Sequence, residues 1–525
     1  MTKRGFGKDE APLKIVIYSV FIYVLSMLWI FPLYYQDKYY NMGEAKFTFF
    51  KHMSIIFLSI ALFSLAYHVF VTFRSIPWKK LKSHLMISDY FVIAYAVIVW
   101  ISFLLTPYKS DALWGYEGWY MGLISQMIFV VIYFLVSRFL NFKSFLIHGS
   151  SIVSGIVFLV AILHRFQIDP LAMYENLTMT NKILFLSTIG QATWYSSYLC
   201  TSLPLGIFMY WNEERSEVKI AYGVYLFLGF ASLVTQNSDS AFIALGLMIA
   251  TLFLFSFQSS EKMKRFLEVA IIMLVSFKII GILQVSFPEK VVPLEELSIA
   301  VSQGNFVWIL LVIVMVAYLL LRFPDEKKPF RVIGNKLIPK IIVVLAFASV
   351  PIVVLLVYLT TLGALPAFLS GLDSIGYLHF NNDWGNGRGF TWQYAAAMFA
   401  EYSPIRKLFG CGPDCFAAYS YELHSAELTA KWGDSILTNA HNEWFTSLLF
   451  FGIAGATAYI GIFVSQAVLC IKRALQEPLL VAVTMSILAY MGHNFFCYQQ
   501  VVCTPIIFII MALGQSSIKK LNESR

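Results

Sequence analysis

Long apolar runs, separated by short polar connections, make up most of this chain of 525 residues. A transmembrane helix needs about 20 consecutive apolar residues to cross the hydrocarbon core of a bilayer. The run at 220–235 is short and the last run contains Pro505, so we predict about 12–14 spans. The pattern therefore predicts an all-α, polytopic transmembrane helical bundle. The apolar runs lie near 14–34, 53–73, 86–106, 119–137, 145–164, 191–210, 220–235, 240–257, 266–286, 304–321, 341–362, 443–470, 479–495 and 501–516.

Composition and charge agree with a membrane protein and argue against a nucleic-acid-binding one. Charged residues make up only 13% of the chain and hydrophobic residues 59%, whereas a soluble domain carries about 25% charged residues. The 38 lysines and arginines exceed the 30 acidic residues, but they lie mostly in short connections between apolar runs. If the N-terminus is cytoplasmic, the basic clusters near 3–14, 74–82 and 322–340 all fall on the cytoplasmic side. We therefore expect a plasma-membrane protein with both termini in the cytoplasm.

One polar segment, 363–440, interrupts the apolar pattern and falls on the extracytoplasmic side in this topology. Long segments of this kind are usually either functional or disordered, and the aromatic residues spread through this one argue against disorder. Within it, residues 390–402 have the alanine-rich, amphipathic character of a helix, and a turn is expected at 410–413. We expect residues 1–362 and 441–525 to form the membrane helices and 363–440 to form a large extracytoplasmic catalytic loop.

Arg388 and His441 are the two residues of this region best suited to chemistry. Arg388 stands between glycines, where its planar guanidinium could bind phosphate oxygens, but an arginine that binds lipid headgroups would look the same. His441 lies where a membrane helix is expected to begin, with Asn439 as its N-cap. The positive end of a helix lowers the pKa of a histidine, so a neutral His441 could act as a general base. A structural role is the simpler interpretation of a lone histidine.

Five more residues are candidates for binding a substrate. Asp239 lies in a tight polar turn between two apolar runs on the outer side, although a simple turn explains it equally well. Asp434 and Glu443 could orient the histidine or bind sugar hydroxyls, or they could simply be solvated. The six cysteines show no metal-ligand spacing, and we predict no metal site. The five candidates are Asp239, Trp392, Asp434, Asn442 and Glu443.

The order of four short motifs along the chain resembles that of the O-antigen ligase / polymerase superfamily of bacterial membrane glycosyltransferases. The motifs are Arg-Gly-Phe-Thr-Trp at 388–392, Gly-Cys-Gly at 410–412, Ala-His-Asn-Glu-Trp at 440–444 and Gly-Ile-Ala-Gly at 452–455. The resemblance implies transfer of a glycan from a polyprenyl-diphosphate carrier to a hydroxyl of a glycan, lipid or protein acceptor outside the cytoplasm, in cell-surface polysaccharide synthesis. It also implies that His441 activates the acceptor, that Arg388 binds the diphosphate, and that neither a metal nor another cofactor takes part.

One position departs from the family pattern. The family carries a second arginine in an outer turn, and the corresponding turn here has Asp239 in its place, which cannot neutralise a diphosphate. Another cation could substitute for it, and the candidates are Arg165, Lys182 and Arg406. Alternatively, the donor differs from that of the family, or the turn corresponds to a different part of the family pattern.

A lipid-linked oligosaccharide flippase is the main alternative, because a bundle of this size also suits a transporter. A flippase is expected to show paired halves with polar or broken helices near the membrane midplane. This chain instead concentrates its polar residues in one late extracytoplasmic loop. A scaffold without chemistry is the third alternative, and it would tolerate neutral substitutions at both Arg388 and His441. We therefore expect an enzyme.

Overall fold

The fold is built from helices along nearly the whole chain. The basic residues expected on the cytoplasmic side at 3–8, 74–82, 327–331 and 336 lie outside the described residues. Each apolar run of the sequence coincides with a helix, and one small antiparallel sheet pairs β1 (Phe185–Leu186) with β2 (Gly190–Gln191). The all-α fold class is therefore confirmed. The computed structural model describes residues 11–72, 85–323, 333–335 and 337–523.

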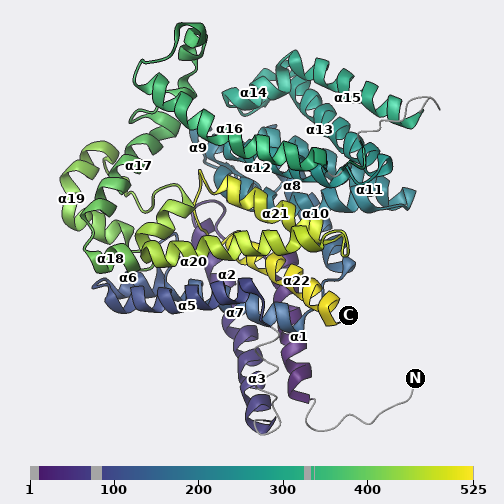
Figure 1. Ribbon diagram of the computed structural model, residues 1–525. Helices are drawn as coiled ribbons and strands as arrows, with labels where there is room; N and C mark the ends of the chain where they lie inside the picture. Colours follow the sequence, from purple (N-terminus) through teal and green to yellow (C-terminus); the bar gives the residue numbers. More distant parts are fainter. Residues whose placement is uncertain (1–10, 73–84, 324–332, 336, 524–525) are drawn as a thin grey trace, which may run out of the picture.

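The helices follow one another through mostly short connections (Figure 1). Two of the early ones contain a π-helical turn, since α1 continues as η2 and α2 continues through η3 into α3. The apolar helices are α1 (Ala11–Leu25), η2 (Ser26–Ile30), α2 (Met42–Met53), η3 (Ser54–Leu58), α3 (Ser59–Thr72), α5 (Ile87–Leu105), α7 (Leu123–Phe139), α8 (Ser144–Arg165), α10 (Ala192–Asn212), α11 (Ser216–Thr235), α12 (Ser240–Ser256), α13 (Ser260–Ser286), α15 (Phe306–Arg322), α16 (Leu337–Thr361), α20 (Glu443–Arg473), α21 (Leu480–His493) and α22 (Thr504–Glu523). The connecting helices are α6 (Lys109–Trp114), α9 (Met179–Leu184), η5 (Pro288–Lys290), α14 (Glu296–Gln303), η6 (Ala367–Ser374), η7 (Gly376–Leu378), α17 (Trp384–Glu401), α18 (Pro404–Phe409) and α19 (Phe416–Trp432).

Several of these helices are suited to cross a membrane. Within the described residues, 8 helices are long and apolar enough to span a bilayer, and α14 with α15, bent by 49°, raises the number to 9 if the pair counts as one span. The shorter apolar helices α7, α12 and α21 accompany them. The chain is therefore a multi-pass membrane protein. Together, the candidate spans and these shorter helices cover most of the apolar runs seen in the sequence.

Helix α21 lies at the centre of the bundle, where it packs against α10, α12, α20 and α22. Helix α10 is likewise surrounded by other helices, and it is buried along nearly its whole length, from Tyr195 to Trp211. Helix α16 is the opposite case, since its apolar window has no buried residue and most of its valines and leucines are exposed. Such an apolar, unburied helix is suited to a surrounding of lipid.

Helices α17, α18 and α19 form a cap at one end of the bundle, beside α6 and the ends of α5 and α20 (Figure 1). The helix predicted at 390–402 is confirmed as the main part of α17. The turn predicted at 410–413 is also present, with left-handed backbone at Gly410 and Gly412. Helices α18 and α19 are the parts of the cap that the sequence did not predict.

Two glycines fix the cap to a break in α20. At Gly452 (φ 65°) helix α20 is kinked, and a Cβ atom there would lie 2.3 Å from the carbonyl oxygen of Leu408. At Gly410 (φ 80°) a Cβ would lie 2.1 Å from the carbonyl oxygen of Phe450, which also accepts the backbone N–H of Gly412 over 3.2 Å. Only glycine tolerates both the left-handed backbone and such a close approach. Gly410 and Gly452, which belong to two of the sequence motifs, therefore allow the cap to pack closely against α20.

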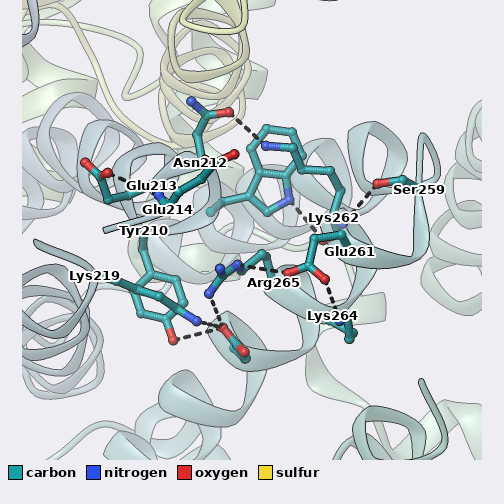
Figure 2. A network of polar contacts seen from close by, with 12 residues as sticks. Tyr210, Asn212, Glu213, Glu214, Lys219, Ser259, Glu261, Lys262, Lys264 and Arg265 are labelled. Carbon is teal, nitrogen blue, oxygen red and sulfur yellow. Dashed lines mark hydrogen bonds and ion pairs between the residues drawn. The ribbon is translucent and has the colours of Figure 1, made fainter. Parts of the chain in front are cut away.

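A network of charged side chains joins the end of α10 and the starts of α11 and α13 (Figure 2). Glu268 pairs with Lys219 at 2.5 Å and with Arg265 at 3.4 Å, and it accepts the hydroxyl of Tyr210 over 3.2 Å. Helix α10 has 21 residues, so a rise of 1.5 Å per residue places its two ends about 30 Å apart. The network therefore lies at the opposite end of α10 from Ala192.

Candidate functional site

A cavity of about 550 Å³ opens where the cap meets the bundle. It lies between the starts of α10, α12 and α17 and the connection that joins α21 to α22. Apolar side chains form much of its wall, together with one arginine and two carboxylates, a combination that suits an amphipathic ligand. Its polar lining includes Asn237, Ser238, Asp239, Ser240, Glu295 and Arg388.

Arg388 extends into this cavity from the start of α17. Its Nη1 donates to the carbonyl oxygen of Gly385 over 2.7 Å, and its Nη2 donates to that of Phe496 over 2.9 Å. The Nε atom is buried without a hydrogen-bond partner, so the five N–H donors of the guanidinium are only partly used. Burial lowers the pKa of Arg388, and the neighbouring Asp239 and Glu295 carboxylates oppose this shift. The guanidinium remains charged at neutral pH and has donors left for an acceptor-rich ligand.

His441 stands between the cap and α20 in a left-handed backbone conformation (φ 48°). Its backbone N–H donates to Oδ1 of Asn439 over 2.8 Å, and its ring lies 5.2 Å from the ring of Tyr498. Left-handed backbone is uncommon outside glycine, and strain of this kind is concentrated at functional sites. Burial, and then the charge of Arg388, lower the pKa of His441 to about 4. The imidazole is therefore neutral at physiological pH and able to accept a proton.

The prediction that Asn439 caps α20 is wrong. The helix begins at Glu443, and Asn442 is its N-cap, with Oδ1 accepting the backbone N–H of Phe445 over 2.9 Å. Asn439 lies too early in the chain and uses its side-chain oxygen for the N–H of His441. Asn442, which we predicted as a substrate contact, thus holds the start of the helix next to the histidine.

The connection 494–503 brings Arg388 and His441 into one site. Its Phe496 provides the carbonyl oxygen that accepts Arg388, and its Tyr498 provides the ring that packs against His441. The charge of Arg388 also contributes to the low pKa of His441. The two predicted catalytic residues, which come from different elements, are therefore neighbours in the structure.

Trp392 strengthens this arrangement from α17. Its Nε1 donates to the carbonyl oxygen of Ala440, the residue before the histidine, over 3.0 Å. Its ring stacks on Phe496 at 5.9 Å and lies 5.4 Å from that of Trp384. The result is an aromatic surface at the edge of the site, of the kind that packs against sugar rings.

Asp239 lies in the turn between α11 and α12, as the sequence predicted. Its Oδ2 accepts the hydroxyl of Tyr377, in η7, over 2.9 Å. It lines the same cavity as Arg388. Asp239 and Arg388 therefore lie in the same site.

The three cations suggested as substitutes lie elsewhere. Arg165 is fully buried and donates to backbone carbonyls, including that of Gln236 over 3.1 Å. Arg406 stacks over the ring of Tyr419 at 4.7 Å. Among the described residues that line the cavity, Arg388 is present but Arg165, Lys182 and Arg406 are not.

Two further predicted contacts have different surroundings. Glu443 is buried, and its carboxylate accepts hydrogen bonds from the hydroxyls of Tyr459 and Tyr490 and from the amide of Asn494. Asp434 is exposed after the end of α19. Glu443 thus organises the interior of the protein beneath the site, whereas Asp434 lies at the outer edge of the cap.

Asp414 is a buried carboxyl group that the sequence analysis did not single out as a site residue. Its Oδ2 accepts the backbone N–H groups of Tyr116 over 2.8 Å and Met121 over 2.9 Å. Burial raises its pKa to about 7. The residue ties the cap to the outer connection before α7. Across the described parts of the chain, no group of three or more His, Cys, Asp or Glu side chains is placed to hold a metal ion.

A model of the O-antigen ligase family matches residues 297–460. This part of the chain is therefore similar to an O-antigen ligase domain. The domain runs from α14 to the kinked half of α20 and contains the cap, Arg388 and His441. The match confirms the resemblance to the O-antigen ligase / polymerase superfamily and supports a ligase- or polymerase-type function in polysaccharide biosynthesis. A search of curated proteins found no match.

Parts of the site lie outside this O-antigen ligase domain. Asp239 and Glu295 precede it, and the connection 494–503 follows it. Glu295, Tyr377 and this connection were not predicted from the sequence. The available signal was polarity, because 493–500 carries histidine, asparagine and glutamines between two apolar runs.

Proposed function

We propose that this chain transfers a glycan from a polyprenyl-diphosphate carrier to an acceptor hydroxyl on the extracytoplasmic side of the membrane. The pairing of Arg388 with His441 is the observation that supports this most directly. A cation with unused donors and a neutral imidazole share one site beside a partly apolar cavity. The O-antigen ligase domain favours a transferase over a flippase.

The proposed sidedness follows from charge. The network at the far end of α10 contains basic residues 262–265, which the positive-inside rule assigns to the cytoplasm. The cavity lies at the other end of α10, at Ala192, and so would face the extracytoplasmic side. Because ATP is absent there, the substrate has to arrive already activated. A sugar attached to a lipid diphosphate meets that condition.

The cavity suits a lipid-linked donor. Exposed Leu184 and Ile243 contribute to its lining and would contact the polyprenyl chain. Arg388 would bind the diphosphate through its unused N–H groups, since a guanidinium fork matches phosphate oxygens. The aromatic surface around Trp392 would lie beside the glycan.

The proposed reaction is an inverting displacement. His441 removes the proton of the acceptor hydroxyl as its oxygen bonds to the anomeric carbon, and the bond between that carbon and the diphosphate oxygen breaks. The proton remains on the imidazole until solvent removes it, and the electron pair leaves with the lipid diphosphate. General-base assistance typically contributes about 10²–10⁴-fold. Arg388 stabilises the developing charge of the leaving group, a type of contribution worth roughly 3–4 kcal/mol.

The test is glycan transfer by the purified full chain in proteoliposomes, with lipid-linked glycan and acceptor extracted from the native host. We expect His441→Ala and Arg388→Ala each to lower the rate at least about 100-fold. His379→Ala and Arg406→Ala are matched controls, because both residues belong to the same region of the chain but have other partners. His379 contacts the carbonyl oxygen of Asp373, and Arg406 stacks over the ring of Tyr419. Transfer at the wild-type rate by folded His441→Ala protein would refute the proposal.

A further inference from the structure

The cavity beside Arg388 carries more acceptors than donors on one part of its wall. The turn between α11 and α12 contributes Ser238, Asp239 and Ser240, and the segment before α14 contributes Glu295. A carboxylate offers only lone pairs to a ligand. These groups add two negative charges next to a single arginine, which is an unusual composition for a site that holds only a diphosphate.

Asn237 joins the two parts of this wall. Its Nδ2 donates to the carbonyl oxygen of Pro293 over 2.8 Å, and its Oδ1 accepts the backbone N–H of Glu295 over 3.2 Å. Asn237 is buried and has a left-handed backbone (φ 61°). The turn and the acidic segment therefore form one unit, and Glu295 is held beside Asp239.

A buried chain of hydrogen bonds connects Glu443 to the serines of this wall. The amide NH2 of Asn494 donates to the carboxylate of Glu443, so its Oδ1 faces Nδ1 of His493 at 2.5 Å. That nitrogen must therefore carry the hydrogen, and in a singly protonated imidazole Nε2 is an acceptor. Nε2 lies 2.7 Å from Oγ of Ser196, closer than the 3.0 Å between this hydroxyl and the Thr193 carbonyl. Ser196 thus donates to His493.

The chain of polar groups continues to the cavity. Oγ of Ser196 lies 3.5 Å from Oγ of Ser238, the longest contact of the chain. Ser238 in turn lies 2.8 Å from Ser240, and either hydroxyl of this pair can donate to the other. The carboxylates of Asp239 and Glu295, which offer only lone pairs, therefore make this part of the wall rich in acceptors.

We propose that Ser238, Asp239, Ser240 and Glu295 form a sugar subsite that accepts hydrogen bonds from hydroxyl or amino groups of the glycan unit attached to the diphosphate. His493 is a positioning residue for this subsite, because its imidazole holds Ser196, which contacts Ser238, while His493 itself does not line the cavity. This inference rests on the proposed glycan transfer. It extends that function by assigning the diphosphate to Arg388 and the first sugar to the acceptor wall.

The wall favours a sugar over a second phosphate contact. Asp239 and Glu295 repel an anion, whereas they bind the O–H and N–H groups that cover a sugar. The rings of Tyr377 and Trp384 line the same cavity and would pack against the apolar face of a pyranose. An aspartate at the family's arginine position is then a specificity feature of this chain.

The test compares two probes on the purified full chain in nanodiscs. One probe is polyprenyl diphosphate without sugar, and the other is the lipid-linked glycan extracted from the native host. For Ser240→Ala and Glu295→Gln we expect the dissociation constant of the glycan probe to rise about fivefold to tenfold, the effect of one hydrogen bond. The sugar-free probe should bind as well as to wild type, or more tightly to Glu295→Gln, which removes a negative charge. Glu296→Gln, at the next position and outside the cavity lining, should change neither probe.

The role of His493 is tested by the same comparison of the dissociation constants of the two probes. His493→Gln places an amide near the position of Nε2 and should keep part of the preference for the glycan probe. His493→Asn retains only the contact near Nδ1 and should lose that preference. Equal weakening of both probes by Ser240→Ala and Glu295→Gln, or no change in either, would overturn the subsite. Failure of the wild-type chain to bind either probe would instead contradict the proposed function itself.

Discussion

Lowering the pH from about 7.5 to about 5.5 should leave glycan transfer almost unchanged. His441 has to be neutral to take the acceptor proton, and its pKa is lowered to about 4 by burial and by the charge of Arg388. At pH 5.5 such a histidine is still about 97% neutral, whereas one with the ordinary pKa of about 6.5 would be only about 9% neutral. Because its pKa is lowered, His441 becomes protonated, and stops acting as a base, only in more acidic solution. The rate should therefore fall with a midpoint near pH 4.

The assay is the initial rate of transfer in proteoliposomes with saturating donor and acceptor, so that binding does not limit the rate. A roughly tenfold loss by pH 5.5, with a midpoint near 6.5, would refute the assignment of a half-buried, neutral base. Unfolding has to be followed at each pH as a control. The unfolded chain binds a proton at this histidine below about pH 6.5 and the folded chain does not, so stability falls as the pH drops from 6.5 towards 4.

Three other predictions follow from individual contacts. Trp392→Phe keeps an aromatic ring but removes the hydrogen bond to the carbonyl oxygen of Ala440. We expect kcat to fall severalfold while the KM for the donor changes little. An unchanged kcat would contradict a role of Trp392 in holding the segment that carries His441. Asn442→Ala removes the N-cap of α20 and should lower the free energy of unfolding by about 1 kcal/mol, measured by denaturation in detergent; an unchanged stability would contradict the cap. Asp414 has a pKa raised to about 7 from an ordinary value near 4, so it stabilises the fold fully below pH 4 and loses that contribution as the pH rises through 7. Asp414→Asn should abolish this decline in Tm, and a decline that persists in the variant would assign it to another group.

The helices were predictable because they depend on local composition. Each apolar run became a helix, since a segment in lipid must satisfy its own backbone hydrogen bonds. The cap helix at 390–402 was found for a similar local reason, its amphipathic pattern. Helix α19 was missed because its pattern is weak and is interrupted at His424, whose backbone is non-helical.

The site was predictable only in part. The sequence singled out Arg388 and His441, and the structure places them together through Phe496 and Tyr498. That link is a long-range contact without a local signal. The same holds for the hydrogen bond between Tyr377 and Asp239, two residues separated by 138 positions.

The N-cap error has a simple physical cause. Asn439 and Asn442 are both good capping residues in sequence, and the choice between them depends on where the backbone turns into the helix. The left-handed conformation of His441 delays the start of α20 until Glu443. Sequence alone does not show such a backbone reversal in a histidine.

Glycan transfer by Arg388 and His441 is best tested by glycan analysis of the native host strain. Strains carrying wild type, His441→Ala or Arg388→Ala at equal membrane levels would be compared for lipid-linked donor and for transferred product. We expect donor to accumulate on the outer face of the membrane and product to be missing in both variants. Unchanged product would contradict the role of these residues, and donor trapped on the cytoplasmic face would show that the chain moves the glycan rather than transferring it.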